Sequence, residues 1–102
     1  MRVGFGVRLQ FYVDPETSEP HIYRHEVDEV EVAEVLAAYG LRWHEGEGKW
    51  IVVGKTGDGR FLQVIYLVED GSRETTFVIT AYPPKKELIA AYRRRMRKKG
   101  KR

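Results

Sequence analysis

The chain has 102 residues, no cysteine, and a formal net charge of +3 at pH 7. This length predicts a single domain over residues 1–102, with one modest core. The lack of cysteine excludes disulfides, thiolate metal sites and thiol nucleophiles, and it favours a reducing, cytoplasmic location. No apolar run approaches the ~18 residues of a membrane helix, so we expect no membrane partner.

The charge is distributed unevenly along the chain. From Lys85 to Arg102 there are ten Lys or Arg residues and one acid, which gives +9, whereas the rest carries eight basic and fourteen acidic residues, or −6. An acidic body with a basic end, which includes a C-terminal tail at residues 98–102, predicts a polyanionic partner, most often nucleic acid. The alternative interpretation is a solvated helix end that only keeps the protein soluble.

The first predicted element is a strand over residues 3–13, because apolar residues occupy every odd position from Val3 to Val13. Asp14-Pro15 ends it. The stretch to Pro20 is predicted to be a loop or one helical turn, since proline cannot lie inside a longer helix.

A helix is predicted from Glu29 to Tyr39. Asp28 and Glu31 have the spacing of a capping box, and Gly40 is the expected C′ residue. Apolar residues at i, i+3, i+4 and i+7 give this helix one buried stripe.

Residues 41–49 are predicted to form a polar connection with a short strand at its start. Three apolar runs follow, at residues 50–56, 61–68 and 76–82, and their short polar links predict an antiparallel meander. Asp58-Gly59 in the first link is typical of a type I′ turn. The middle run is apolar on both faces, which indicates a central strand.

A last helix is predicted over residues 84–97, with Leu88, Tyr92 and Met96 docked on the sheet and the arginines turned outward. The order of elements is therefore β-α-β-β-β-α. We expect an α+β domain with a small antiparallel sheet of about four strands and helices packed beside it.

The chain resembles the BrnT-type toxins of the RelE/ParE superfamily. Their pattern F-x-x-D-P-x-K-x-x-x-N-x-x-K-H-G-V-S is similar to F-Y-V-D-P-E-T-S-E-P-H-I-Y-R-H-E-V-D here, from Phe11 to Asp28. A later family stretch, G-x-T-x-D-G-R-x-L, is similar to G-K-T-G-D-G-R-F-L from Gly54 to Leu62. The family's closing I-S-A-R is similar to Ile79-Thr80-Ala81-Tyr82, and the resemblance spans roughly residues 11–92.

This resemblance implies a RelE-like fold, ribonuclease activity without metal or cofactor, and two partners, RNA and a cognate antitoxin. Arg24 replaces lysine and keeps the charge, and Asp28 replaces serine and keeps the cap, but four other departures matter more. Thr17 and His21 replace lysine and asparagine, Glu26 replaces glycine, and Tyr82 stands where the family has an arginine of its RNA-cleaving surface. Tyr82 is either a substitute for that arginine or a loss of activity.

Three residues are the candidate catalytic groups. His25 suits general acid–base chemistry because imidazole titrates near neutrality. Arg60 would offset charge on the transition-state phosphate, and Tyr82 would donate a hydrogen bond or stack on a base. The candidate RNA-binding residues are Arg24, Lys49, Lys85, Lys86, Arg93, Arg94 and Arg97.

Each candidate also has a structural interpretation. His25 would bond a backbone carbonyl beside the helix cap, Arg60 would pair with an acid across strands, and Tyr82 would cover the edge of the core. His21 and His44 are predicted to be surface residues. A metal site at His21 and His25 is not expected, because Pro20 keeps any helix there short.

Two hypotheses follow from these observations. The first is the toxin of a type II toxin–antitoxin system, a metal-independent ribonuclease. The alternative is a non-catalytic relative of the same fold that binds nucleic acid or an antitoxin.

Overall fold

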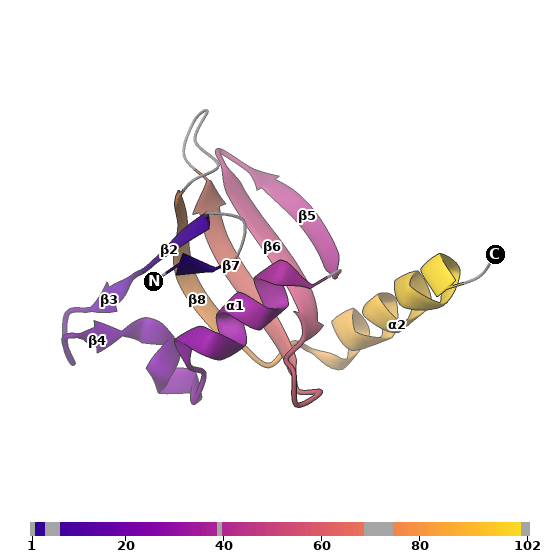
Figure 1. Cartoon of the computed structure of the whole chain (residues 1–102), viewed down its shortest axis with the longest axis horizontal. Coiled ribbons are helices and arrows are strands. Elements are labelled where there is room, and N and C mark those ends of the chain that lie inside the picture. Colours follow the sequence, from indigo (N-terminus) through magenta and orange to yellow (C-terminus); the bar gives the residue numbers. More distant parts are fainter. Residues whose placement is uncertain (1, 4–6, 39, 69–74, 101–102) are drawn as a thin grey trace.

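A computed structural model of the protein describes residues 2–3, 7–38, 40–68 and 75–100. A twisted sheet lies at the centre, with α1 across one face and α2 at the opposite end of the molecule from the β3–β4 hairpin (Figure 1). The strands are β1 (Arg2–Val3), β2 (Val7–Phe11), β3 (Val13–Asp14), β4 (Glu19–Pro20), β5 (Leu41–Gly46), β6 (Lys49–Lys55), β7 (Phe61–Val68) and β8 (Thr75–Tyr82). The helices are η1 (His21–His25, 3₁₀), α1 (Glu29–Ala37) and α2 (Lys86–Gly100).

The main sheet has six strands in the order β1-β2-β8-β7-β6-β5. The predicted α+β class is confirmed, but the predicted antiparallel sheet of about four strands is wrong, because β2 pairs with β8 in parallel. The chain leaves β2, forms the hairpin and two helices, and builds β5 to β8 before it returns to the side of β2. RelE-likeness stays a prediction.

The meander of β6, β7 and β8 is antiparallel, as predicted, and it aligns Val53 with Gln63 and Gln63 with Tyr82. The predicted type I′ turn is wrong, because Gly59 has positive φ (85°) and Asp58 does not. The second link, residues 69–73, lies outside the described residues.

The segment predicted as a polar connection is instead a full strand, β5. Polar side chains of this strand pack on aromatic rings, so its sequence lacks the apolar residues that would have predicted a full strand. The Arg42 guanidinium donates to the Tyr66 hydroxyl at 2.8 Å and lies over that ring. The ring centroids of His44 and Trp50 are 4.8 Å apart.

The predicted single strand over residues 3–13 is wrong at both ends: Val3 lies in β1, which pairs antiparallel with β2, and β2 ends at Phe11 rather than Val13. The Tyr12 N–H still donates to the Val78 carbonyl of β8 at 2.9 Å. Val13, however, pairs with Pro20 in the small hairpin, and its side chain is 51% exposed. The alternation therefore predicted a buried face only as far as Leu9 and Phe11, which pack in the core.

Helix α1 begins with the predicted capping box, in which the Glu31 N–H donates to Asp28 Oδ1 at 2.8 Å and the Asp28 N–H donates to Glu31 Oε1. The helix ends at Ala37 and its C-cap is Ala38, so Gly40 is not the C′ residue. Gly40 has a different role. A Cβ there would lie 2.6 Å from the Val53 carbonyl oxygen, so glycine permits the close approach of β5 to β6.

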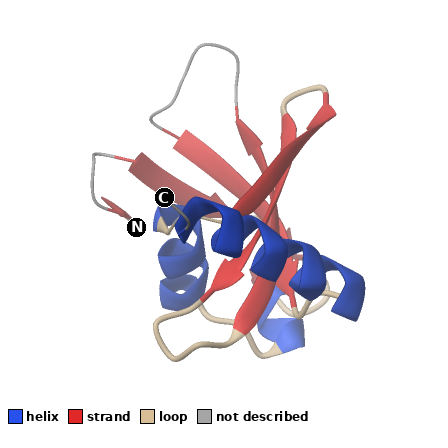
Figure 2. Ribbon diagram, turned by 90° about the vertical axis from the view of Figure 1, so that its right-hand side faces the viewer, coloured by secondary structure: helices blue, strands red, loops and turns tan. Residues whose placement is uncertain are grey.

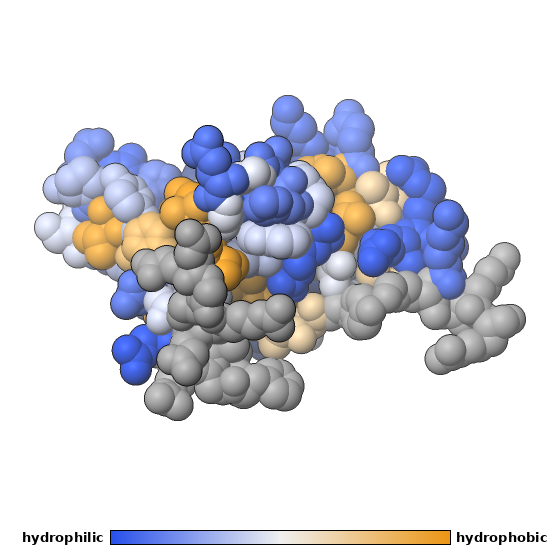
Figure 3. Space-filling view, turned by 90° about the horizontal axis from the view of Figure 1, so that it is seen from above, coloured by the Kyte–Doolittle hydropathy of each residue, from blue (hydrophilic) through white to orange (hydrophobic). Residues whose placement is uncertain are grey.

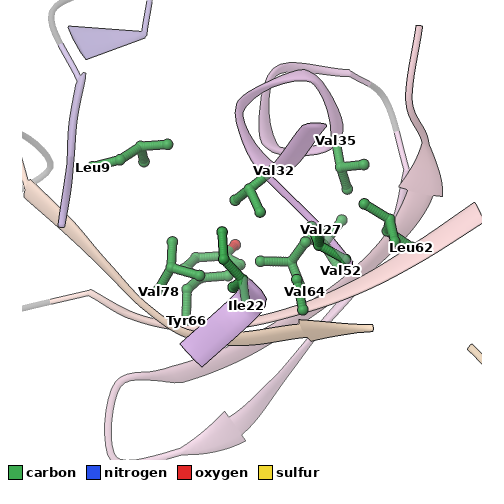
Figure 4. Packing of buried hydrophobic residues seen from close by; sticks show 11 residues of the cluster. Leu9, Ile22, Val27, Val32, Val35, Val52, Leu62, Val64, Tyr66 and Val78 are labelled. Atoms are coloured by element: carbon green, nitrogen blue, oxygen red, sulfur yellow. The ribbon is translucent and has the colours of Figure 1, made fainter. Parts of the chain in front are cut away.

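The core lies between α1 and one face of the sheet (Figure 4). Alternation along β7 places Leu62, Val64 and Tyr66 on this face, as predicted, and each is less than 5% exposed. The buried cluster comprises Leu9, Ile22, Val27, Val32, Val35, Val52, Leu62, Val64, Tyr66, Val78 and Ala81.

Helix α2 crosses the sheet at the side of β5 and β6 (Figure 2). It starts at Lys86 rather than Pro84, and the N–H of Leu88 donates to the Lys85 carbonyl. The Tyr92 ring packs edge-on against Phe61 at 5.4 Å, on the sheet face opposite Leu62. Hydrophilic side chains gather over this end of the molecule (Figure 3). None of the helices within the described ranges is long and apolar enough to cross a bilayer.

Glu26 joins η1 to α1 and adopts a left-handed conformation, with φ 57° and ψ 40°. Its N–H donates to the carbonyls of Ile22 and Tyr23. This conformation is costly for a residue with a Cβ and is free of that cost for glycine. It explains why a glycine would suit this position, as in the pattern that the chain resembles.

We therefore expect Glu26→Gly to raise the free energy of unfolding by about 1 kcal/mol, because it removes the steric cost of the left-handed conformation. Glu26→Ala is the matched control, since it removes the same side chain and keeps the Cβ. Urea denaturation of both variants measures the difference. Equal stabilities would show that Glu26 carries no conformational cost.

Candidate functional site

Helix η1 brings two histidines beside the end of β8. It starts directly after Pro20, whose φ of −52° suits a helix start, and it spans His21 to His25. Buried Ile22 anchors it in the core, so the two imidazoles turn outward. His21 was predicted to be a surface residue; its side chain is 32% exposed, and it also contacts buried Asp14 and the His25 ring.

Four rings form a continuous row, which we call the ring row. The centroid of Tyr12 lies 6.1 Å from that of His21, His21 lies 5.6 Å from His25, and His25 lies 5.5 Å from Tyr82. Two of the three predicted catalytic residues, His25 and Tyr82, thus touch although they lie far apart in the sequence.

Asp14 is the buried anion beside this row, with a side chain 7% exposed. Its Oδ1 accepts the Glu16 N–H at 2.9 Å, and its Oδ2 accepts from Arg24 Nε and from His21 Nδ1 at 3.3 Å. The hydrogen bond from the Glu16 backbone, with those from Arg24 and His21, lowers the pKa of Asp14 below its ordinary value of 3.8 even though burial opposes the shift.

Asp14 and His21 were not predicted as site residues. Their only signal is the spacing Asp14, His21, Arg24 and His25, which places three polar groups on a short turn that follows a hairpin. Without the hairpin, nothing in that spacing brings Asp14 back against η1.

Arg60 is near His25 in the structure, and its partly exposed guanidinium faces the junction between η1 and α1. It donates to the Glu26 carbonyl at 2.8 Å, to the His25 carbonyl at 3.2 Å and to both carboxylate oxygens of Glu31 at 3.2 and 3.3 Å. These acceptors hold the β6–β7 turn against η1 and α1. Arg60 therefore positions His25 through the His25 carbonyl. All the acceptors of the Arg60 guanidinium named here belong to the protein itself.

The predicted RNA-binding residues divide into separate groups. Arg24 pairs with Asp14 and, at 3.4 Å, with exposed Glu16. Lys85 and Lys86 are exposed and follow Tyr82 closely, at the start of α2.

Arg93 lies over the Phe61 ring, with its guanidinium carbon 5.4 Å from the centroid, and Lys55 lies near the same ring. Phe61 shares a sheet face with Gln63, the register partner of Tyr82. Tyr82 and Phe61 therefore lie on one sheet face, with the buried side chain of Gln63 between them.

The remaining basic residues lie elsewhere. Arg94 lines a hollow of about 350 Å³ with Leu41, Arg95 and Lys98, beside β5. Arg97 is exposed further along α2. Lys49 begins β6, four residues before the register row of Val53 and Tyr82, or about 13 Å along the strand. Lys49 is therefore not part of the group around His25.

Within the residues that the structure describes, no three His, Cys, Asp or Glu side chains gather as a set of metal ligands. A search of protein-family models, curated proteins and solved structures finds no match to this chain. The resemblance to the BrnT-type toxins therefore rests on the motifs quoted above.

We expect Arg60→Lys to lower the free energy of unfolding by about 1–3 kcal/mol, because a lysine cannot reach two carbonyls and a carboxylate together. Arg94→Lys on exposed α2 is the control and should leave stability unchanged. Chemical denaturation measures both. Unchanged stability in Arg60→Lys would show that these internal bonds do not hold the turn in place.

The lowered pKa of Asp14 predicts a dependence of stability on pH. The ionised carboxylate stabilises the fold above its ordinary pKa of 3.8, and this contribution is lost as the pH falls through the lower pKa of the folded state. Asp14→Asn should therefore flatten the fall in unfolding free energy below about pH 4. Asp58→Asn in the exposed β6–β7 turn should leave the curve unchanged, and denaturation from about pH 6 to pH 2 gives both curves.

Proposed function

We propose that the protein is a metal-independent endoribonuclease, the toxin of a toxin–antitoxin pair, that acts at His25 and Tyr82. One observation carries the proposal: the two rings lie 5.5 Å apart at the end of β8, directly before the exposed, basic start of α2. RNA transesterification needs an acid–base group, a hydrogen-bond donor and cations in one place. The ring row would supply the first two, and the exposed lysines that follow Tyr82 in the chain would supply the cations.

In this proposal, the 2′-oxygen of RNA attacks the adjacent phosphorus and the 5′-oxygen leaves. His25 carries one of the two proton transfers, and the Tyr82 hydroxyl donates to a phosphate oxygen. Lys85 and Lys86 contact neighbouring phosphates. The Tyr82 ring offers a surface on which a base stacks.

The resemblance to BrnT-type toxins supports the wider biological role. A cognate antitoxin would inhibit the protein by covering the ring row. Expression of the protein alone should then arrest growth, and expression of His25→Ala should not.

A second candidate function is RNA binding without cleavage. The commitment of Arg60 to Glu31 and to two backbone carbonyls favours it, because these acceptors leave the Arg60 guanidinium less able to offset transition-state charge. In that case the basic α2 would bind RNA with an affinity that falls steeply as salt rises.

The proposal predicts that the purified protein cleaves single-stranded RNA in the presence of EDTA and leaves 2′,3′-cyclic phosphate ends. His25→Ala should slow cleavage by ~10²–10⁴-fold, the usual contribution of a general acid or base. The measurement is single-turnover cleavage of end-labelled RNA.

His44→Ala is the matched control, because His44 lies on β5, three strands from β8, against Trp50. It should cleave like the unaltered protein. RNA that stays intact, or cleavage that His25→Ala does not slow, would exclude the ribonuclease. Salt-dependent RNA binding without cleavage would instead support the second function, and replacing Arg93, Arg94 and Arg97 with glutamine should then reduce the salt dependence.

A further inference from the structure

His21 has an environment that an incidental surface histidine does not need. Its Nδ1 faces Oδ2 of buried Asp14 at 3.3 Å, and its ring meets His25 edge-on at a centroid distance of 5.6 Å. The Tyr12 ring flanks His21 on the other side, and the backbone N–H of His21 donates to the Tyr12 carbonyl at 2.9 Å. The backbone, the ring stack and the carboxylate together fix where this imidazole points.

The carboxylate also selects which nitrogen of His21 carries a proton. The hydrogen bonds that lower the pKa of Asp14 keep it ionised near neutral pH, and an ionised carboxylate only accepts hydrogen bonds. Nδ1 of His21 is therefore the donor to Asp14. Nε2 is left as the nitrogen that takes or gives a proton during a reaction.

We propose that His21 is the second acid–base residue of the ribonuclease and that Asp14 is its positioning residue. This inference rests on the proposed function, and it names the partner that His25 needs. Transesterification moves two protons, one from the 2′-hydroxyl and one to the leaving 5′-oxygen. A single imidazole beside Tyr82 accounts for one of them, and the adjacent imidazole accounts for the other.

The step balances with these two groups alone. One imidazole, in its neutral form, accepts the 2′-hydroxyl proton while the 2′-oxygen forms a bond to phosphorus. The other, in its protonated form, gives its proton to the 5′-oxygen as the bond between that oxygen and phosphorus breaks. The products are a 2′,3′-cyclic phosphate and a 5′-hydroxyl, and no oxidant, reductant or further reactant is consumed.

The pair requires one neutral and one charged imidazole, so the rate should fall at both low and high pH. The charged groups that face it are known from the contacts. Asp14 lies against His21, Arg24 bonds to the same carboxylate oxygen of Asp14, and Glu16 pairs with Arg24. Tyr12 and Tyr82 flank the two histidines.

The test is the pH–rate profile of RNA cleavage by the full chain in EDTA, with His21→Asn, Asp14→Asn and the double variant. We expect a bell-shaped profile for the unaltered protein. His21→Asn should lower the maximal rate by ~10²-fold or more and remove one limb of the bell. His44→Asn is the control and should keep both the rate and the bell.

The double variant separates positioning from a merely structural role. Asp14→Asn should lower kcat more than it changes KM in the unaltered background, and it should have no further effect once His21 is asparagine, because Asp14 acts through His21. A structural role would lower the rate by the same factor in both backgrounds. Circular dichroism of each variant confirms that it is folded, and His21→Asn alone decides the case if Asp14→Asn unfolds.

The outcomes distinguish the two proposals. If the unaltered protein does not cleave RNA, the proposed function fails and this inference fails with it. If it cleaves RNA and His25→Ala abolishes cleavage, while His21→Asn keeps both the rate and the bell, only the inference is overturned. Loss of one limb of the bell-shaped pH–rate profile in His21→Asn supports both the proposed function and this inference.

Discussion

One guanidinium, that of Arg60, holds the junction between the sheet, η1 and α1 together. Arg60 stands at the end of the β6–β7 turn and donates to the carbonyls of His25 and Glu26 and to the carboxylate of Glu31. The same carboxylate accepts the Asp28 N–H that completes the α1 capping box. A single charged pair therefore joins the sheet, the end of η1 and the start of α1. Since the Arg60 and Glu31 side chains are only partly exposed, each bond in this group carries more weight than a surface ion pair.

This junction explains a local strain. The chain must turn from η1 to α1 within two residues, because Val27 is buried and Asp28 already caps α1. Glu26 makes the turn in a left-handed conformation that disfavours its Cβ. Its carbonyl is held by Arg60, so the bond that fixes the junction also offsets the strain. As a consequence of this arrangement, the His25 ring lies against Tyr82.

The parts of the fold that the sequence predicted have local signals. Asp28 and Glu31 define the start of α1 through a spacing of three, and alternation defines β7 and its neighbours. Alternation assigns faces but not neighbours, so the parallel pairing of Leu9 with Thr76 could not be predicted. The pairing of His25 with Tyr82 came from the family resemblance and from no spacing. An acidic partner for Arg60 was predicted across strands, but Glu31 lies on α1. The two backbone carbonyls that Arg60 also contacts leave no mark in the sequence.

In the proposed function, the charges of the site would divide chemistry and binding between two elements. Near the ring row, Arg24 is paired with Asp14 and Arg60 is paired with Glu31. These cations hold the histidines in place and are largely neutralised by their acids. The exposed positive charge lies further on, at Lys85, Lys86 and the arginines of α2. An approaching polyanion would therefore be attracted to α2 and oriented by it, and it would meet the imidazoles only where the chain passes from β8 into that helix.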